Sequence, residues 1–156
     1  MDTTAASTTT APSDPAKEAT DAFLAYEEAF LAAAVIPDPE HPALLDTATG
    51  ENLADDVAQL RAWQLTGRVV RPIGSATEGV RVLSAGVQPD GTAQIRACIT
   101  DDDHVVIAAT GEVVNDDVVT RLVDLRLVVD GGRWKVSRFR VAERWEGVAG
   151  CAANAG

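Results

Sequence analysis

The sequence predicts an α+β domain, in which N-terminal helices pack across a strongly curved antiparallel sheet and form a cone with one open end. Two observations lead to this fold class. Before Gly67 the apolar residues recur at helical spacing, and after it they alternate at the spacing of strands. The helical part also precedes the strands rather than alternating with them, which is typical of α+β proteins. The length of 156 residues fits one domain.

The first helix is expected over residues 15–35. Asp14 can cap its N-terminus, and Pro15 suits the first helical position. Three prolines follow closely and end the helix, because proline cannot continue it. Glu27 is expected to face the solvent. The aromatic residues at helical spacing, which mark the buried face, are Phe23, Tyr26 and Phe30.

Two further helical segments complete the N-terminal part. A short turn is expected over residues 43–47, and a longer helix follows Gly50. Trp63 lies near the end of that helix. Gly67 suits its C-cap, because glycine readily adopts the left-handed backbone conformation found there.

The rest of the chain predicts strands separated by turn residues. A half-buried strand is expected at residues 93–100, where apolar and polar side chains alternate. The glycine-rich turn at 130–132 joins the last two strands into a hairpin. The inward phase of the last strand shifts near Ser137, which predicts a bulge. The expected strands begin at Val69 and cover residues 69–70, 79–87, 93–100, 104–109, 119–129 and 133–141.

The charge of the chain excludes one class of partner. The formal net charge is −11, and a nucleic-acid-binding protein needs a basic surface instead. Residues 1–66 hold 12 acids and 2 bases, whereas residues 67–156 hold 12 acids and 11 bases. The acids are expected to make the helical layer soluble, or else to orient the domain by repelling anionic surfaces. No apolar run is long enough to predict a membrane-spanning helix.

Both ends of the chain are expected to lie outside the folded domain, which should cover residues 14–151. Residues 1–13 are rich in Thr, Ser and Ala and hold no large apolar group. Such a segment cannot bury enough surface to become ordered. It predicts a disordered spacer between an envelope anchor and the domain, or else the frayed terminus of a cytoplasmic protein. Residues 152–156 are expected to form a flexible tail.

Cys98 and Cys151 are the only cysteines. Cys151 lies on a Gly- and Ala-rich tail that no apolar residue would hold, so we expect it to be joined to Cys98 by a disulfide; two free thiols are the alternative. Their spacing is not that of a zinc site. Because disulfides persist in oxidising compartments, the bond implies an extracellular or cell-surface location.

Two segments and the cysteine placement carry a resemblance. Ala-Cys-Ile-Thr-Asp at 97–101 and Gly-Gly-Arg-Trp-Lys-Val at 131–136 are followed by the closing Cys151. This pattern resembles small exported or lipoprotein domains of high-GC Gram-positive bacteria, which have a nuclear-transport-factor-like (ketosteroid-isomerase-like) cone and include Mce-associated proteins. The resemblance implies an envelope-facing domain, and relatives of this cone often pair as homodimers. The signal segment or lipobox cysteine of such proteins does not appear in this sequence.

Enzymes with such cones need an acid held in an apolar cavity, together with a phenol or second acid that donates to the developing oxyanion. Tyr26, the only tyrosine, and Asp124 are the candidates in this chain, with Glu143 as a further candidate acid on a strand. Each has a simpler interpretation, Tyr26 as a core aromatic and Asp124 as a surface acid paired with an arginine. Trp63 and Trp134 are expected to pack in the core or at the rim of the cavity. We assign no catalytic residue.

Two clusters of charged residues remain to be interpreted. The acidic run at 101–104 is expected to form a solvated turn, because its consecutive acids lack the alternating spacing of cation loops, and no metal or cofactor is assigned. Four arginines on alternate strand positions are expected to share one sheet face. They would form either a salt-bridged surface with Asp124 or a docking face for an acidic partner or lipid headgroups. These residues are Arg96, Arg126, Arg138 and Arg140.

Together these observations predict a non-enzymatic binding or scaffolding domain of the bacterial cell envelope. Its partner would be an envelope protein or a small apolar ligand. One alternative is a small isomerase- or cyclase-like enzyme that uses the cone cavity. The other is a cytoplasmic interaction domain with free thiols.

Overall fold

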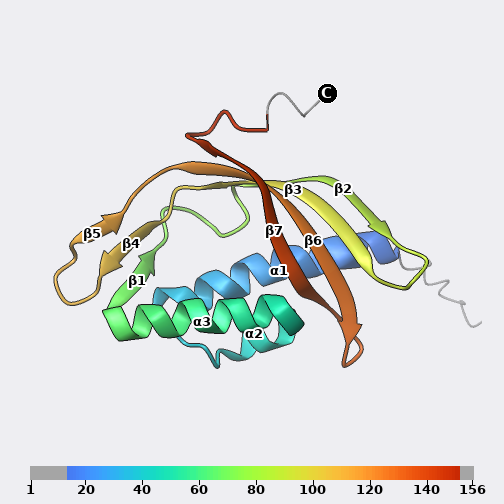
Figure 1. Cartoon of the computed structure of the whole chain (residues 1–156), viewed down its shortest axis with the longest axis horizontal. Helices are drawn as coiled ribbons and strands as arrows, with labels where there is room; N and C mark the ends of the chain where they lie inside the picture. The colour runs from blue at the N-terminus through green and yellow to red at the C-terminus, as the bar shows by residue number, and fades with distance from the viewer. Residues whose placement is uncertain (1–13, 152–156) are drawn as a thin grey trace, which may run out of the picture.

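The computed structural model describes residues 14–151, which form three helices packed on two antiparallel sheets (Figure 1). The α+β class and the packing of helices on curved antiparallel strands are therefore confirmed. The sheets do not close into a barrel. The predicted spacer and tail, residues 1–13 and 152–156, lie outside the described residues. Within 14–151, no helix is both long and apolar enough to traverse a membrane.

The longest helix, α1 (Pro15–Val35), begins and ends at the residues expected from the sequence. The Asp14 carboxylate accepts hydrogen bonds from the backbone N–H groups of Ala16 and Lys17, which have no partner inside the helix. In Figure 1 the helix runs beneath the concave side of the larger sheet. Its buried face includes Phe23, which is fully enclosed.

Two helices follow α1 and pack beside it. The short α2 (Pro42–Thr47) begins with a proline and corresponds to the expected turn. The longer α3 (Gly50–Thr66) ends at Gly67, whose backbone is left-handed, with φ of 67°. Glycine readily adopts this conformation, as expected for the C-cap of this helix.

The larger sheet has the strand order β2-β3-β6-β7. Its inward side chains on β3 and β6 alternate as expected and form the centre of the core under α1. The last strand continues for five residues beyond the expected end at 141, because its pairing with β6 extends to Val119. The strands of this sheet are β2 (Val80–Val87), β3 (Ala93–Asp101), β6 (Val119–Asp130) and β7 (Arg133–Glu146).

The smaller sheet consists of β1 (Arg68–Arg71), β4 (His104–Ile107) and β5 (Val113–Asn115) in the order β1-β4-β5. The chain passes from β3 into β4 through only two residues, so the two sheets form one bent surface (Figure 1). Strand β5 was not expected. Its three residues are all exposed and carry no alternating pattern that could mark it.

The bulge expected near Ser137 is present. The pairing of β6 with β7 shifts between Arg126 and Leu127, so Ser137 has no partner opposite it. Its hydroxyl donates instead to the backbone carbonyl of Arg126 over 3.1 Å. A second shift between Leu122 and Val123 bends β7 again near its C-terminal end. These bulges curve the sheet around the helices.

Candidate functional site

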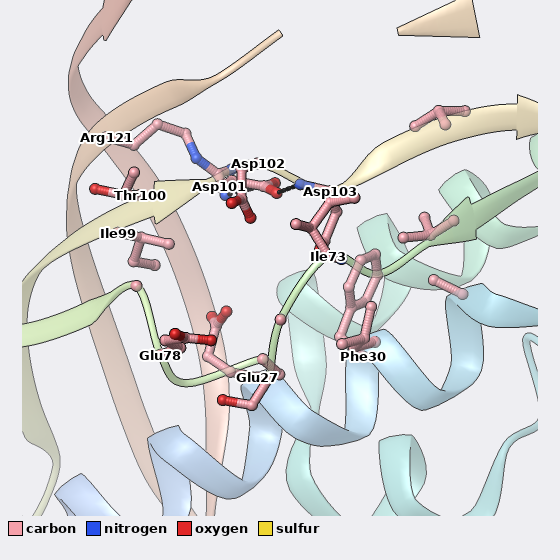
Figure 2. Close-up of a pocket in the computed structure, with 18 of the residues that line it drawn as sticks. Glu27, Phe30, Ile73, Glu78, Ile99, Thr100, Asp101, Asp102, Asp103 and Arg121 are labelled. Atoms are coloured by element: carbon pink, nitrogen blue, oxygen red, sulfur yellow. Dashed lines mark hydrogen bonds and ion pairs between the residues drawn. The ribbon is translucent and has the colours of Figure 1, made fainter. Parts of the chain in front are cut away.

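A cavity of about 440 Å³ opens between α1, the end of α3 and the bent junction of the two sheets. The loop at residues 72–79, which joins β1 to β2, closes one side of it. Figure 2 shows this loop passing in front of α1, with the end of β3 above. A space of this size falls within the range of small-molecule sites, about 300–1,000 Å³.

The deeper walls of the cavity are apolar. Phe30 on α1 and Trp63 on α3 lie against each other, with ring centroids 6.3 Å apart and tilted planes. Ile99 contributes from the inward face of β3 and is almost fully buried. Trp63 therefore lines the cavity. The other apolar side chains here are Leu31, Ala34, Val70 and Val105, whereas Ile73 lines the cavity from the loop and is exposed.

The mouth of the cavity is acidic. Five carboxylates line it, and Arg121 on β6 is the arginine among the lining residues. Arg121 lies 3.8 Å from the Asp101 carboxylate and 5.9 Å from the centre of the Phe139 ring. These contacts hold its guanidinium at the upper edge of the cavity, as Figure 2 shows. The five acids are Glu27, Glu78, Asp101, Asp102 and Asp103.

Glu27 is the acid that projects from the helix side. The expectation that it faces solvent is wrong, because the loop at 72–79 and the strand ends cover this side of α1 and leave Glu27 half-buried. Burial raises the pKa of its carboxyl from 4.5 to about 7, and the nearby charges of Asp101 and Asp56 act in the same direction. Arg121 opposes them in part. In Figure 2 the carboxylate points up from α1 into the cavity.

The acidic run at 101–104 forms the expected turn between β3 and β4, but it also builds the cavity wall. The Asp103 carboxylate accepts a 3.0 Å hydrogen bond from the Ile73 backbone and so ties down the loop at 72–79. The Asp101 carboxylate accepts a 2.9 Å hydrogen bond from the backbone N–H of Asp103. Within the described part of the chain, no three His, Cys, Asp or Glu side chains converge in a way that could hold a metal ion.

Tyr26 does not reach the cavity. It lies one residue before Glu27, on the side of α1 that faces α3, and is 4% exposed. Its hydroxyl donates a 2.8 Å hydrogen bond to the Asp56 carboxylate, and the Asn52 side-chain oxygen lies 3.4 Å away. Burial raises the pKa of Tyr26 well above 10.0 and that of Asp56 to about 6. Asp56 and Asn52 are not recognisable from the sequence, since α3 carries many polar residues.

Asp124 lies on the outer face of the larger sheet, away from the cavity. It forms a bidentate ion pair with Arg96, with N–O distances of 2.8 and 2.9 Å. This contact lowers the pKa of Asp124. The other candidate on these strands, Glu143, is exposed on β7 opposite Leu122. Neither acid can therefore act in the cavity.

Three of the four arginines lie beside different acidic partners. Arg126 lies 4.0 Å from Asp90, and Arg138 lies 3.2 Å from Glu51 on α3. Arg140 is exposed and lies opposite Asp124 in the pairing of β6 with β7. Together with the pair of Arg96 and Asp124, these contacts fit the salt-bridged surface that the sequence suggested.

Trp134 stands at the start of β7, beside the hairpin turn and away from the cavity. It is half-buried and packs against the edge of the core, whereas Val136, two residues later, takes the fully enclosed position. The predicted disulfide between Cys98 and Cys151 is confirmed. It fastens the end of the described chain to the outer face of the sheet, where Leu122 and Trp145 pack around it.

Three cavity residues, Glu27, Glu78 and Arg121, are not apparent from the sequence. The strand pattern could have identified Arg121. It lies two residues before Val123 and so occupies an inward position of β6. A charged side chain at an inward position often marks a site. The loop that carries Glu78 has no periodicity that would place it.

No family model matches this chain, and no curated protein matches its sequence. Its fold is similar to that of the intermembrane space region of the chloroplast protein ARC6, with a TM-score of 0.63 and 17% identity over 83% of this chain and 98% of that one. It is also similar to the Kfla4162 protein from Kribbella flavida, with a TM-score of 0.51 and 16% identity over 83% and 91%. At these identities the likeness concerns the fold.

Proposed function

We propose that this chain is a non-enzymatic binding domain of the bacterial cell envelope, exported or tethered at the surface, which holds a small, largely apolar ligand in the cavity beside α1. The observation that carries the proposal is the combination of a cavity of about 440 Å³ with apolar inner walls. Phe30, Trp63 and Ile99 offer a ligand a surface whose burial is favourable.

The proposed location rests on the disulfide between Cys98 and Cys151. Such bonds persist in oxidising compartments and are rare in the cytoplasm. The ARC6 region with a similar fold is itself named for an intermembrane space. The resemblance of the sequence to exported nuclear-transport-factor-like domains supports the same proposal.

A neutral aromatic probe, tryptophol, tests whether the cavity accepts a ligand. In amide-resolved NMR spectra, tryptophol should shift the signals of residues 72–79 and 99–103. Ala76→Trp should weaken this binding because Ala76 lines the cavity, whereas Ala85→Trp, at an exposed site on β2, should leave it unchanged. Shifts confined to other regions, or equal binding by both variants, would contradict the proposed site.

One observation favours the isomerase-like alternative. Glu27 is a half-buried acid in a partly apolar cavity with a pKa of about 7, which suits a general base. The second requirement, a donor to the oxyanion, is not met by Tyr26, whose hydroxyl donates to Asp56. The alternative predicts that the protein isomerises a β,γ-unsaturated ketone and that Glu27→Gln abolishes this activity. Equal rates with and without protein would exclude it for this substrate class.

A further inference from the structure

We infer that the cavity selects ligands that join an apolar body to one positive charge, such as an alkyl- or arylammonium ion, and that the Glu27 carboxylate binds this charge. The inference rests on the proposed function, since it specifies the ligand of the same cavity. It follows from the way in which the charged groups at the mouth are already engaged.

Three of the charged groups have partners within the protein. Arg121 is held by Asp101 and by the ring of Phe139. Asp101 also accepts the backbone N–H of Asp103, and Asp103 accepts that of Ile73. An anionic ligand would have to separate Arg121 from Asp101 and approach four further carboxylates. The cavity is therefore unfavourable for anions.

Glu27 is different. Its carboxylate points into the cavity, and the influences on it within residues 14–151 are burial and the charges of Arg121, Asp101 and Asp56, with no hydrogen bond among them. A half-buried carboxylate without a hydrogen-bonding partner is costly, and the raised pKa of Glu27 reflects that cost. An ammonium group placed beside it would supply the missing donor and the missing charge.

The apolar walls lie next to Glu27, and they favour an apolar body in the rest of the ligand. Phe30 is three residues further along α1, so the two side chains lie close on the same helix face. Trp63 stands against Phe30 from α3. A ligand whose ammonium group meets Glu27 would thus lay its apolar body against these two rings.

Three indole probes that differ mainly in charge test the inference. Tryptamine is cationic, tryptophol is neutral and indole-3-propionate is anionic at about pH 8, where Glu27 is mostly ionised. Dissociation constants are measured from the NMR shifts of residues 72–79 and 99–103. We expect tryptamine to bind at least about tenfold more tightly than tryptophol. Indole-3-propionate should bind more weakly than both.

Two variants then locate the charge recognition. Glu27→Gln should reduce the affinity for tryptamine about tenfold and leave that for tryptophol unchanged. Glu28→Gln, which removes the same charge from the exposed side of α1, should change neither. If the three probes bind equally, or if both variants lose tryptamine alike, the inference fails while the proposed binding cavity stands. If no probe shifts the cavity residues, the proposed function fails as well.

Discussion

The Tyr26 hydroxyl donates a 2.8 Å hydrogen bond to the carboxylate of Asp56, which lies 30 residues further along the chain. The two residues are 4% and 9% exposed, so the bond lies in the interior between α1 and α3. Asn52 joins them and also places its amide nitrogen 3.5 Å from the backbone carbonyl of Val136 on β7. This small polar group therefore connects two helices to the edge of the larger sheet.

Replacing Tyr26 by Phe should destabilise the domain by about 1–3 kcal/mol, because Asp56 would lose its buried donor while remaining buried itself. Asp56→Asn removes the buried charge and keeps an oxygen that can accept from Tyr26, so it should cost less. Urea unfolding of both variants measures the difference. If Tyr26→Phe were neutral, the hydrogen bond would be replaced by water, and the contact between α1 and α3 would be looser than described.

The contrast between Tyr26 and Asp56 shows what could be predicted from the sequence. Tyr26 falls on the apolar phase of a long periodic helix, so its burial follows from local pattern. Its partner is set by how α3 docks, which no local pattern encodes. The same limit applies to Glu27, which local pattern places on a polar face. The loop at 72–79 folds over that face and makes it part of a cavity.

The alternation of apolar and polar residues also predicted parts of the sheet. Alternation identified the inward residues of β3, and the phase shift identified the bulge at Ser137. Trp134, expected in the core or at the rim of the cavity, is half-buried against the edge of the core. The separation of the strands into two sheets depends on the short passage from β3 to β4, which a linear pattern does not reveal.

The free energy of unfolding should fall as the pH rises from about 4 to about 7. Glu27 and Asp56 have ordinary pKa values of 4.5 and 3.8, which burial raises to about 7 and about 6 in the folded protein. Within this window the folded state holds more protons than the unfolded state, so raising the pH favours unfolding. The stabilisation is complete below the ordinary pKa values and is lost above about 7.

Glu27→Gln should flatten this pH dependence, because glutamine does not titrate. The loss of stability between pH 4 and pH 7 should shrink by on the order of 1–3 kcal/mol. Glu28→Gln, on the exposed side of the same helix, serves as the control and should keep the slope of the parent protein. Denaturant unfolding at several pH values gives the slopes. If the free energy of unfolding depended on pH equally in the parent protein and in Glu27→Gln, Glu27 would be solvated like Glu28.

Removing the disulfide should destabilise the domain by about 4 kcal/mol. Cys98 and Cys151 are 53 residues apart, and opening a loop of this size restores much conformational freedom to the unfolded chain. The Cys98→Ala/Cys151→Ala double variant should therefore melt well below the parent protein. Thiol titration of denatured, unreduced protein should find almost no free thiol. Two free thiols per chain would contradict both the bond and the argument for an oxidising compartment.

Gly79 provides the most direct test of how the cavity is closed. It ends the loop at 72–79, and its carbonyl accepts a 2.9 Å hydrogen bond from the backbone N–H of Thr100 on β3. A Cβ atom at this position would collide with the carbonyl oxygen of Thr100. Because that oxygen belongs to the backbone of a paired strand, it cannot turn aside as a side chain would. Gly79→Ala should therefore cost about 1–3 kcal/mol and weaken probe binding in the cavity.

Gly86, on the strand β2 that follows Gly79, is the matched control. A Cβ atom there would meet only the far end of the Gln88 side chain, 4.0 Å away. Gly86→Ala should be neutral or stabilise the domain by up to about 1 kcal/mol, because alanine restricts the unfolded chain more than glycine does. Urea midpoints of the two variants, measured with tryptophol binding on the same samples, provide the comparison. If Gly79→Ala were as harmless as Gly86→Ala, the loop would not close on Thr100. The cavity that depends on this contact would then be open along that side.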